Sequence, residues 1–120
     1  MQPANLDLTI YKGSTYSKLI QWKTGDPAVP VDLTGCTARM QIRKRVNDTE
    51  VLDTLTTENG KLTIYNASEG RLRIDISASQ SSLYSFASGV YDLEIVYPAP
   101  STTVYRILQG CVSVIPEVTR

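Results

Sequence analysis

Histidine is missing from this 120-residue sequence. Its absence removes the side chain that most often serves as a general base, activates a nucleophile or ligates a metal. Only two cysteines are present, Cys36 and Cys111, and their spacing matches no zinc or CxxC pattern. In a reducing compartment we expect buried free thiols rather than a disulfide.

An excess of charge is also missing, because 12 Lys and Arg residues balance 12 Asp and Glu residues. A neutral balance gives no overall attraction to nucleic acid or to an anionic membrane. The longest apolar run is far too short to cross a bilayer. The first residues lack the basic and apolar regions of a signal peptide, so we expect synthesis and folding in the cytoplasm.

Hydrophobic residues make up 42% of the chain, enough for a core without disulfides. We expect one domain over residues 1–120, because no repeat or linker appears. Short alternating segments separated by turns predict strands over 5–11, 15–22, 36–45, 50–57, 62–64, 71–76, 90–97 and 103–115. The pattern is that of a β-sandwich or small barrel, and we predict an all-β, immunoglobulin-like β-sandwich of about seven to nine antiparallel strands.

The central strand is expected to begin at Tyr91. The order of Leu83, Gly89 and Tyr91 is similar to the E–F corner of immunoglobulin-like sandwiches, where a tyrosine hydroxyl turns back onto the preceding loop. The alternative is an ordinary core tyrosine. Trp22 is expected to anchor the core, against the alternative of an exposed binding contact.

Several turns are predicted from local chemistry. Asp32 and Thr34 suit bonds to nearby amides, and Gly35 suits a positive φ, so residues 31–35 are expected to form a tight corner. The alternation of the last strand changes phase near Gly110, where we expect a bulge or a bend. Weak alternation over 50–57 indicates an edge strand, followed by a hairpin signal at Asn59-Gly60. A short helical turn capped by Ser79 is expected to bury Leu83 and Phe86.

Catalysis has little support. Asp92 and Glu94 share an outward face, but charges on an exposed strand face are usually only solubilising. The serines of residues 77–88 have no histidine to activate them, and no phosphate-binding glycine loop appears. We therefore expect no catalytic residues, no metal or cofactor and no small-molecule substrate.

The one basic patch consists of Arg39, Arg43, Lys44 and Arg45. Such a face suits phosphate or an acidic partner. The alternative is a solvated face paired with neighbouring carboxylates. Because no aromatic residues interleave there, we do not expect nucleic-acid binding.

Seven tyrosines in 120 residues favour an interaction module, because tyrosine is enriched at protein interfaces. Tyr65 and Tyr105 are not required by the predicted core and are interface candidates, although half-buried tyrosines on strand faces are an equally ordinary reading. We also expect contacts from the 50–57 strand, the two termini, and the 97–103 hairpin with Pro98 and Pro100.

The order of motifs resembles small bacteriophage virion proteins of the tail, neck and baseplate. It is similar to the immunoglobulin-like N-terminal module of siphophage upper baseplate proteins. The resemblance covers nearly the whole chain: LTIYKGSTYSKLIQW, VDLTGCTARMQIRKR, VLDTLTTENGKLTI, GRLRIDISA, GVYDLEIVY and VYRILQGCVSVIPEVTR. No receptor-binding or helical region follows Arg120, in contrast to those longer proteins.

This resemblance implies a non-enzymatic structural component of a virion. Its partners would be other virion proteins and copies of itself in a symmetric assembly. We expect a tail, neck or baseplate adaptor first, and a capsid decoration or head-fibre base protein second. A DNA-binding accessory protein or a soluble enzyme is the alternative of a different class.

Overall fold

A computed structural model describes residues 2–119, of which 50% are in strands and 7% in helices. The larger sheet has the order β1-β11-β10-β6-β7, with β2 also paired to β11. Its strands are β1 Ala4–Asn5, β2 Leu8–Tyr11, β6 Thr37–Arg43, β7 Asp53–Thr56, β10 Ser88–Val96 and β11 Val104–Ile115. The smaller sheet has the order β3-β9-β8, with β3 Tyr16–Gln21, β8 Leu62–Asn66 and β9 Arg71–Ile76.

The remaining elements are short. Residues 23–30 form a two-stranded ribbon, β4 Lys23–Thr24 and β5 Val29–Pro30. The helices are the 3-10 turn η1 Ala67–Glu69 and the single-turn α1 Ala78–Ser82. The prediction of a mostly β protein without a long helix is thus confirmed for residues 2–119.

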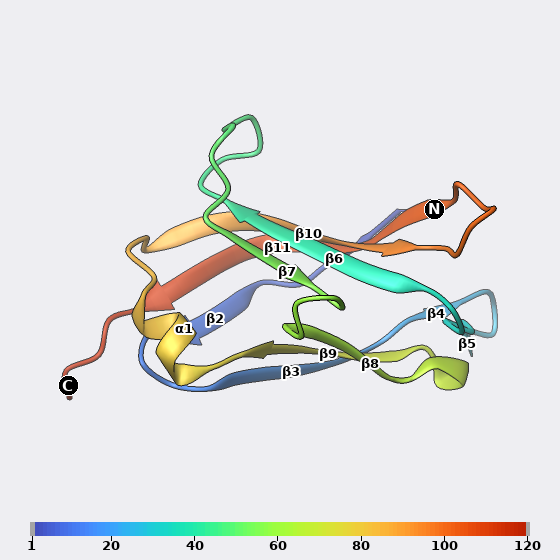
Figure 1. Cartoon of the computed structure of the whole chain (residues 1–120), viewed down its shortest axis with the longest axis horizontal. Coiled ribbons are helices and arrows are strands. Elements are labelled where there is room, and N and C mark those ends of the chain that lie inside the picture. The colour runs from blue at the N-terminus through green and yellow to red at the C-terminus, as the bar shows by residue number, and fades with distance from the viewer. Residues whose placement is uncertain (1, 120) are drawn as a thin grey trace.

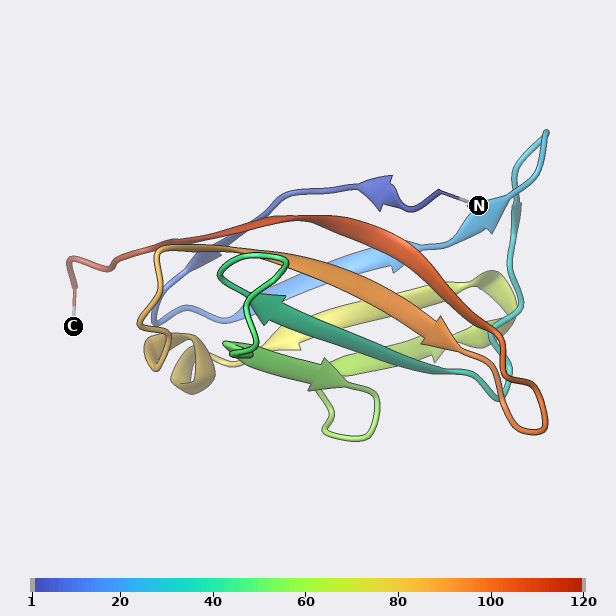
Figure 2. The ribbon, with the colours of Figure 1, turned by 90° about the horizontal axis from the view of Figure 1, so that it is seen from above.

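The two sheets lie face to face with the core between them (Figures 1 and 2), an arrangement compatible with an all-β sandwich. Period-two alternation produces this core, because every second residue of β9 and β10 is buried. Trp22 is 8% exposed and belongs to the core, as predicted. The largest fully buried side chains are Leu8, Ile10, Leu33, Met40, Ile42, Leu55, Leu62, Leu72, Ile74, Ile76, Leu93 and Ile95.

Residues 2–11 depart from the predicted antiparallel strand over 5–11. They form β1 and β2, which both pair parallel with β11. Between them the Leu6 N–H donates to the Gln109 carbonyl at 2.9 Å, and the Asp7 carboxylate accepts from the Cys111 N–H at 3.0 Å. A side chain therefore replaces one rung of the ladder, which splits the segment into two strands. We call residues 2–11 the N-terminal arm.

Tyr91 is buried, but β10 begins three residues before it, at Ser88, and the predicted corner bond is wrong. Its hydroxyl donates to the carbonyl oxygen of Leu6 at 2.5 Å, rather than to the loop before it. The arm runs beside β11, and this places the Leu6 carbonyl next to the Tyr91 hydroxyl. Burial raises the pKa of the Tyr91 hydroxyl, so it remains a donor at neutral pH.

The predicted bulge at Gly110 lies three residues earlier. Leu93 faces Leu108 while Glu94 faces Arg106, so Ile107 is the extra residue of β11. Gly110 has a different role: a Cβ there would lie 2.2 Å from the Leu6 carbonyl oxygen. Its missing side chain is what lets the N-terminal arm approach β11.

The corner over residues 31–35 has the predicted chemistry. The Asp32 carboxylate accepts from the Thr34 N–H at 3.0 Å and from the Thr34 hydroxyl at 2.6 Å, which lowers the pKa of Asp32. Gly35 has φ of +80°, and Leu33 points into the core. At Gly89, a Cβ would lie 2.8 Å from the carbonyl oxygen of Arg43, because β6 and β10 approach closely there.

The helical turn and the cysteines need correction. Ser77, not Ser79, caps α1 by accepting from the Gln80 N–H at 3.1 Å. Leu83 is 75% exposed, and Tyr84 takes the predicted buried place, because its hydroxyl finds a polar partner inside. Both cysteines are free, but only Cys36 is half-buried, while Cys111 on β11 is exposed.

Candidate functional site

The end of the molecule at the 97–103 hairpin carries an aromatic cluster. The rings of Trp22 and Tyr105 meet edge to face with centroids 5.9 Å apart, as do those of Tyr97 and Tyr105. Tyr105 is 40% exposed, although its ring leans on the buried tryptophan. A rigid aromatic side chain that is already ordered loses little entropy when a partner covers it.

The surroundings of this cluster are apolar. Pro98 and Pro100 are exposed in the hairpin, and Val104 follows it at the surface. The β4–β5 ribbon lies at the same end of the molecule but on its other side (Figure 2). We call the set Pro98, Pro100, Val104 and Tyr105 the hairpin-end surface.

A second apolar group lies at the opposite end. Tyr11 is the register partner of Ile115, and Gly13 bonds through its N–H to the Ser81 hydroxyl of α1 at 3.0 Å. These contacts bring the end of the N-terminal arm, α1 and the end of β11 together. The exposed apolar side chains there are Tyr11, Leu83, Ile115 and Val118, which we call the helix-end surface.

The outward face of the larger sheet is charged but internally paired. Arg39 forms an ion pair with Glu94 at 2.8 Å, and Arg106 lies 3.4 Å from Asp92. Arg43 donates to the Asp48 carbonyl at 2.6 Å and so holds the loop that follows β6. The alternative that the sequence left open, a solvated face with paired charges, therefore fits better than a phosphate site.

This face also holds a hollow with a volume of ≈ 650 Å³. The loop between β6 and β7 rises above it (Figure 1). Its lining combines side chains of both charges with apolar ones, including Arg43, Asp92, Arg106, Val46 and Val90. Asp92 and Glu94 are successive outward residues of one strand and each faces an arginine, so they do not converge on a shared point as an acid–base pair would.

Burial raises the pKa of the Asp92 carboxyl, and the positive charge of Arg106 offsets this only in part. The folded protein therefore holds a proton on Asp92 at a pH where the unfolded chain has released it, and stability falls as pH rises through that range. We expect Asp92→Asn to have a free energy of unfolding slightly higher than that of the wild type at pH 7, by less than about 1 kcal/mol.

This difference in the free energy of unfolding should shrink towards pH 4, which is roughly the ordinary pKa of an aspartate side chain. Urea unfolding of both proteins across this range measures it. A variant that is instead weakest at pH 7 would mean that the Arg106 ion pair outweighs the burial of the carboxylate.

Tyr65 lies on the smaller sheet, near the end of β8. Arg73 sits over its ring at 5.9 Å from the centroid and also bonds Asp75 at 2.8 Å. The exposed fraction of Tyr65, 41%, is nearly that of Tyr105. The sequence-predicted interface residues therefore lie on three surfaces: Tyr105, Pro98 and Pro100 at the hairpin end, Arg39 and Arg43 on the larger sheet, and Tyr65 on the smaller sheet.

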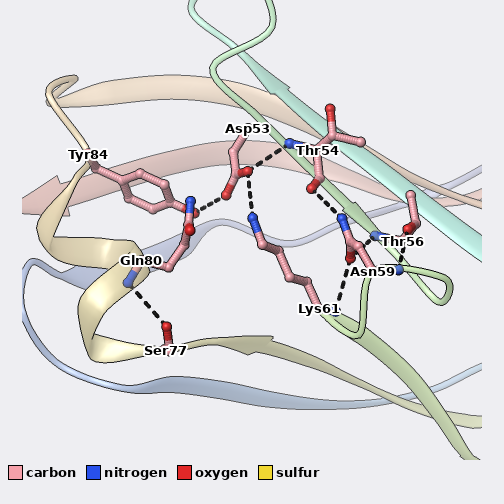
Figure 3. Close-up of polar contacts among 8 residues, drawn as sticks. All are labelled: Asp53, Thr54, Thr56, Asn59, Lys61, Ser77, Gln80 and Tyr84. Carbon is pink, nitrogen blue, oxygen red and sulfur yellow. Dashed lines mark hydrogen bonds and ion pairs between the residues drawn. The ribbon is translucent and has the colours of Figure 1, made fainter.

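The outer edge of β7 is closed by side chains, which sequence reasoning missed. The Thr54 N–H donates to the Asp53 carboxylate at 2.8 Å, and the Thr56 N–H donates to the Asn59 side chain at 2.9 Å. The Asn59 amide in turn donates to the Thr54 carbonyl at 2.9 Å (Figure 3). These are the backbone groups that an added strand would need. The expectation that the 50–57 strand docks a partner by its edge is therefore withdrawn.

Asn59-Gly60 is a turn but not the hairpin turn that the sequence indicated. β7 pairs with β6 in the larger sheet, whereas β8 pairs with β9 in the smaller one. The turn thus crosses between sheets. Asn59 shapes it by also accepting from the Lys61 N–H at 3.0 Å.

A buried polar cluster ties three elements together beside this crossing (Figure 3). The side chain of Asp53 on β7 is 8% exposed; it pairs with Lys61 at 3.0 Å and accepts from the Tyr84 hydroxyl at 2.5 Å. Burial and the bond to Asp53 raise the pKa of Tyr84. Through these bonds the cluster connects β7 with the start of β8 and with the segment that follows α1.

Other classes of site have no counterpart in the structure. Within residues 2–119, no three His, Cys, Asp or Glu side chains are placed to hold a metal ion. No helix in the same range is long and apolar enough to cross a membrane. The comparison of this chain with protein-family models and with curated proteins found no match.

Proposed function

We propose that this protein is a non-enzymatic structural component of a bacteriophage virion, an adaptor of the tail, neck or baseplate. The observation that carries the proposal is that exposed apolar side chains gather at both ends of an elongated body of 44 × 29 × 28 Å. An adaptor must hold two neighbours, and two apolar surfaces at opposite ends suit that task. The paired charges between them keep the sides soluble.

We further propose that the fold is immunoglobulin-like. The order β11-β10-β6-β7 in one sheet and β3-β9-β8 in the other corresponds to strands G, F, C and C′ facing strands B, E and D. Tyr91 lies in the first half of the strand that corresponds to F, although its hydroxyl bonds the N-terminal arm. Small rigid modules of this kind suit symmetric assemblies.

The proposal is tested on particles assembled with tagged variants of the chain. We expect the wild type at a fixed copy number on purified particles. Tyr105→Ala should lower its incorporation, because removing an aromatic anchor costs about 2 kcal/mol of binding, roughly thirtyfold in affinity. The quantity measured is tagged protein per particle, by quantitative mass spectrometry.

Tyr65→Ala is the matched control, since it removes a tyrosine of nearly equal exposure from the smaller sheet, outside the hairpin-end surface. Val118→Asp tests the helix-end surface with little effect on folding, because Val118 is 95% exposed. Absence of the wild-type protein from particles would refute a structural role. Equal incorporation of all four proteins would refute docking through the ends.

A further inference from the structure

The smaller sheet has one edge that nothing described closes. β8, at one border, is irregular, because its register shifts between Ile64 and Asn66. β3, at the other border, pairs only with β9 and runs through six residues without proline, glycine or a register shift. It is thus a straight, uncovered edge, the kind of strand to which another chain adds.

The hydrogen-bonding pattern between β3 and β9 determines which backbone groups of β3 remain available to another strand. The Trp22 N–H donates to the Gly70 carbonyl at 2.8 Å, directly beyond the facing pair of Gln21 and Arg71. Bonds to β9 therefore come from the even-numbered residues. The N–H and C=O groups of Ser17, Leu19 and Gln21 point away from β9, and no backbone partner is described for them within residues 2–119.

Leu19 lies at the centre of this edge. Its side chain is 63% exposed and projects outward beside Arg73, its facing residue on β9. Edge strands of stable monomers usually carry a charge, a proline or a bulge at such a position. An exposed leucine at the midpoint of an open edge instead suits coverage by another strand.

The geometry points to a second copy of this chain as the occupant: we propose that β3 pairs antiparallel with β3 of another copy, with Leu19 facing Leu19. Ser17 then faces Gln21, and all six outward-directed residues of the two strands meet as hydrogen-bonded pairs. The smaller sheet would continue across the two-fold axis as six strands. This deepens the proposed function and rests on its premise that copies of the chain assemble with one another.

Charge favours this self-pairing. The chain has no net charge, so two copies do not repel each other at long range. In the proposed register Lys18 faces Ile20 of the other copy rather than its own counterpart, so like charges do not lie directly opposite. The leucines bury each other on the outward face, and an isologous contact of this kind closes after two copies.

Cysteine cross-linking tests the register. In a full-length background with Cys36→Ser and Cys111→Ser, Leu19→Cys places two thiols on a facing pair whose Cα atoms are about 5.5 Å apart, within the range of a disulfide. Mild oxidation should convert most of this variant into linked dimer. Ser17→Cys, whose two copies would stay roughly 13 Å apart, should remain monomeric. The double variant Ser17→Cys with Gln21→Cys should link again.

Equal linking of the two single variants, or no linking of Leu19→Cys, would overturn the pairing. So would a Leu19→Cys dimer that disappears when residues 2–7 are deleted, because the N-terminal arm of the second copy would then be the occupant. Circular dichroism of each variant checks that it is folded. These results are independent of particle incorporation, so a chain that enters particles without linking at Leu19 refutes only this inference.

Discussion

Asp53→Ala is expected to lower the free energy of unfolding by about 3 kcal/mol, because it leaves a half-buried lysine and a buried tyrosine hydroxyl without their shared acceptor. The Asp53 carboxylate meets Lys61 from the smaller sheet and Tyr84 from the segment after α1. It also caps the Thr54 N–H on the edge of β7. One substitution thus releases three donors at the place where the two sheets are joined. Urea unfolding at neutral pH measures the loss.

Asp75→Ala is the matched control. It removes an aspartate that pairs with Arg73 at 2.8 Å, but both side chains are more than a third exposed. An exposed pair is worth about 0–1 kcal/mol, so this variant should stay close to the wild type. Tyr84→Phe should lie between the two, since it removes one donor and leaves the ion pair. If Asp53→Ala and Asp75→Ala cost the same, the buried cluster does not hold the sheets together.

Strand positions were predictable because burial on one face imposes a period of two on the sequence. β6, β9 and β10 each show this alternation, and each lies where it was expected. The edge position of β7 followed from its weaker alternation, since an edge strand is constrained by fewer neighbours. These are properties that a short stretch of sequence carries by itself.

Pairing between distant segments was not predictable in the same way. Asn59-Gly60 correctly indicates a turn, but a turn does not state which sheet the next strand joins. The parallel arm depends on contacts between Leu6 and Gln109, more than one hundred residues apart, which no local pattern records. The Tyr91 hydroxyl was assigned to the wrong partner for the same reason.

The sequence predicted which types of residue form the candidate surfaces, but not where those residues lie in the fold. Tyrosine content indicated interfaces, but exposure depends on neighbours: Tyr84 is buried and Tyr105 is not. The basic patch was visible in the sequence, whereas its pairing partner Glu94 belongs to a strand more than fifty residues away. The signal for the closed β7 edge was present in Asp53 and Asn59, whose side chains readily bond nearby backbone.

Gly110→Ala is expected to cost about 3 kcal/mol, at the upper end of overpacking effects. The added Cβ would lie 2.2 Å from the Leu6 carbonyl oxygen and 3.0 Å from the Asp7 carboxylate. To make room, the N-terminal arm must move, and with it the oxygen that accepts the Tyr91 hydroxyl. Gly110 does not have a positive φ, so the cost is steric rather than conformational. Thermal and urea unfolding both report it.

Deleting residues 2–7 provides the decisive control, because it removes the atoms with which the new methyl group collides. In that background the same substitution should no longer destabilise the protein. It should raise stability by roughly 0.5 kcal/mol, since glycine within a strand loses more conformational freedom on folding than alanine does. A change of sign between the two backgrounds would show that Gly110 exists to admit the arm. An equal cost in both would mean that the β10–β11 pairing itself requires glycine at this position.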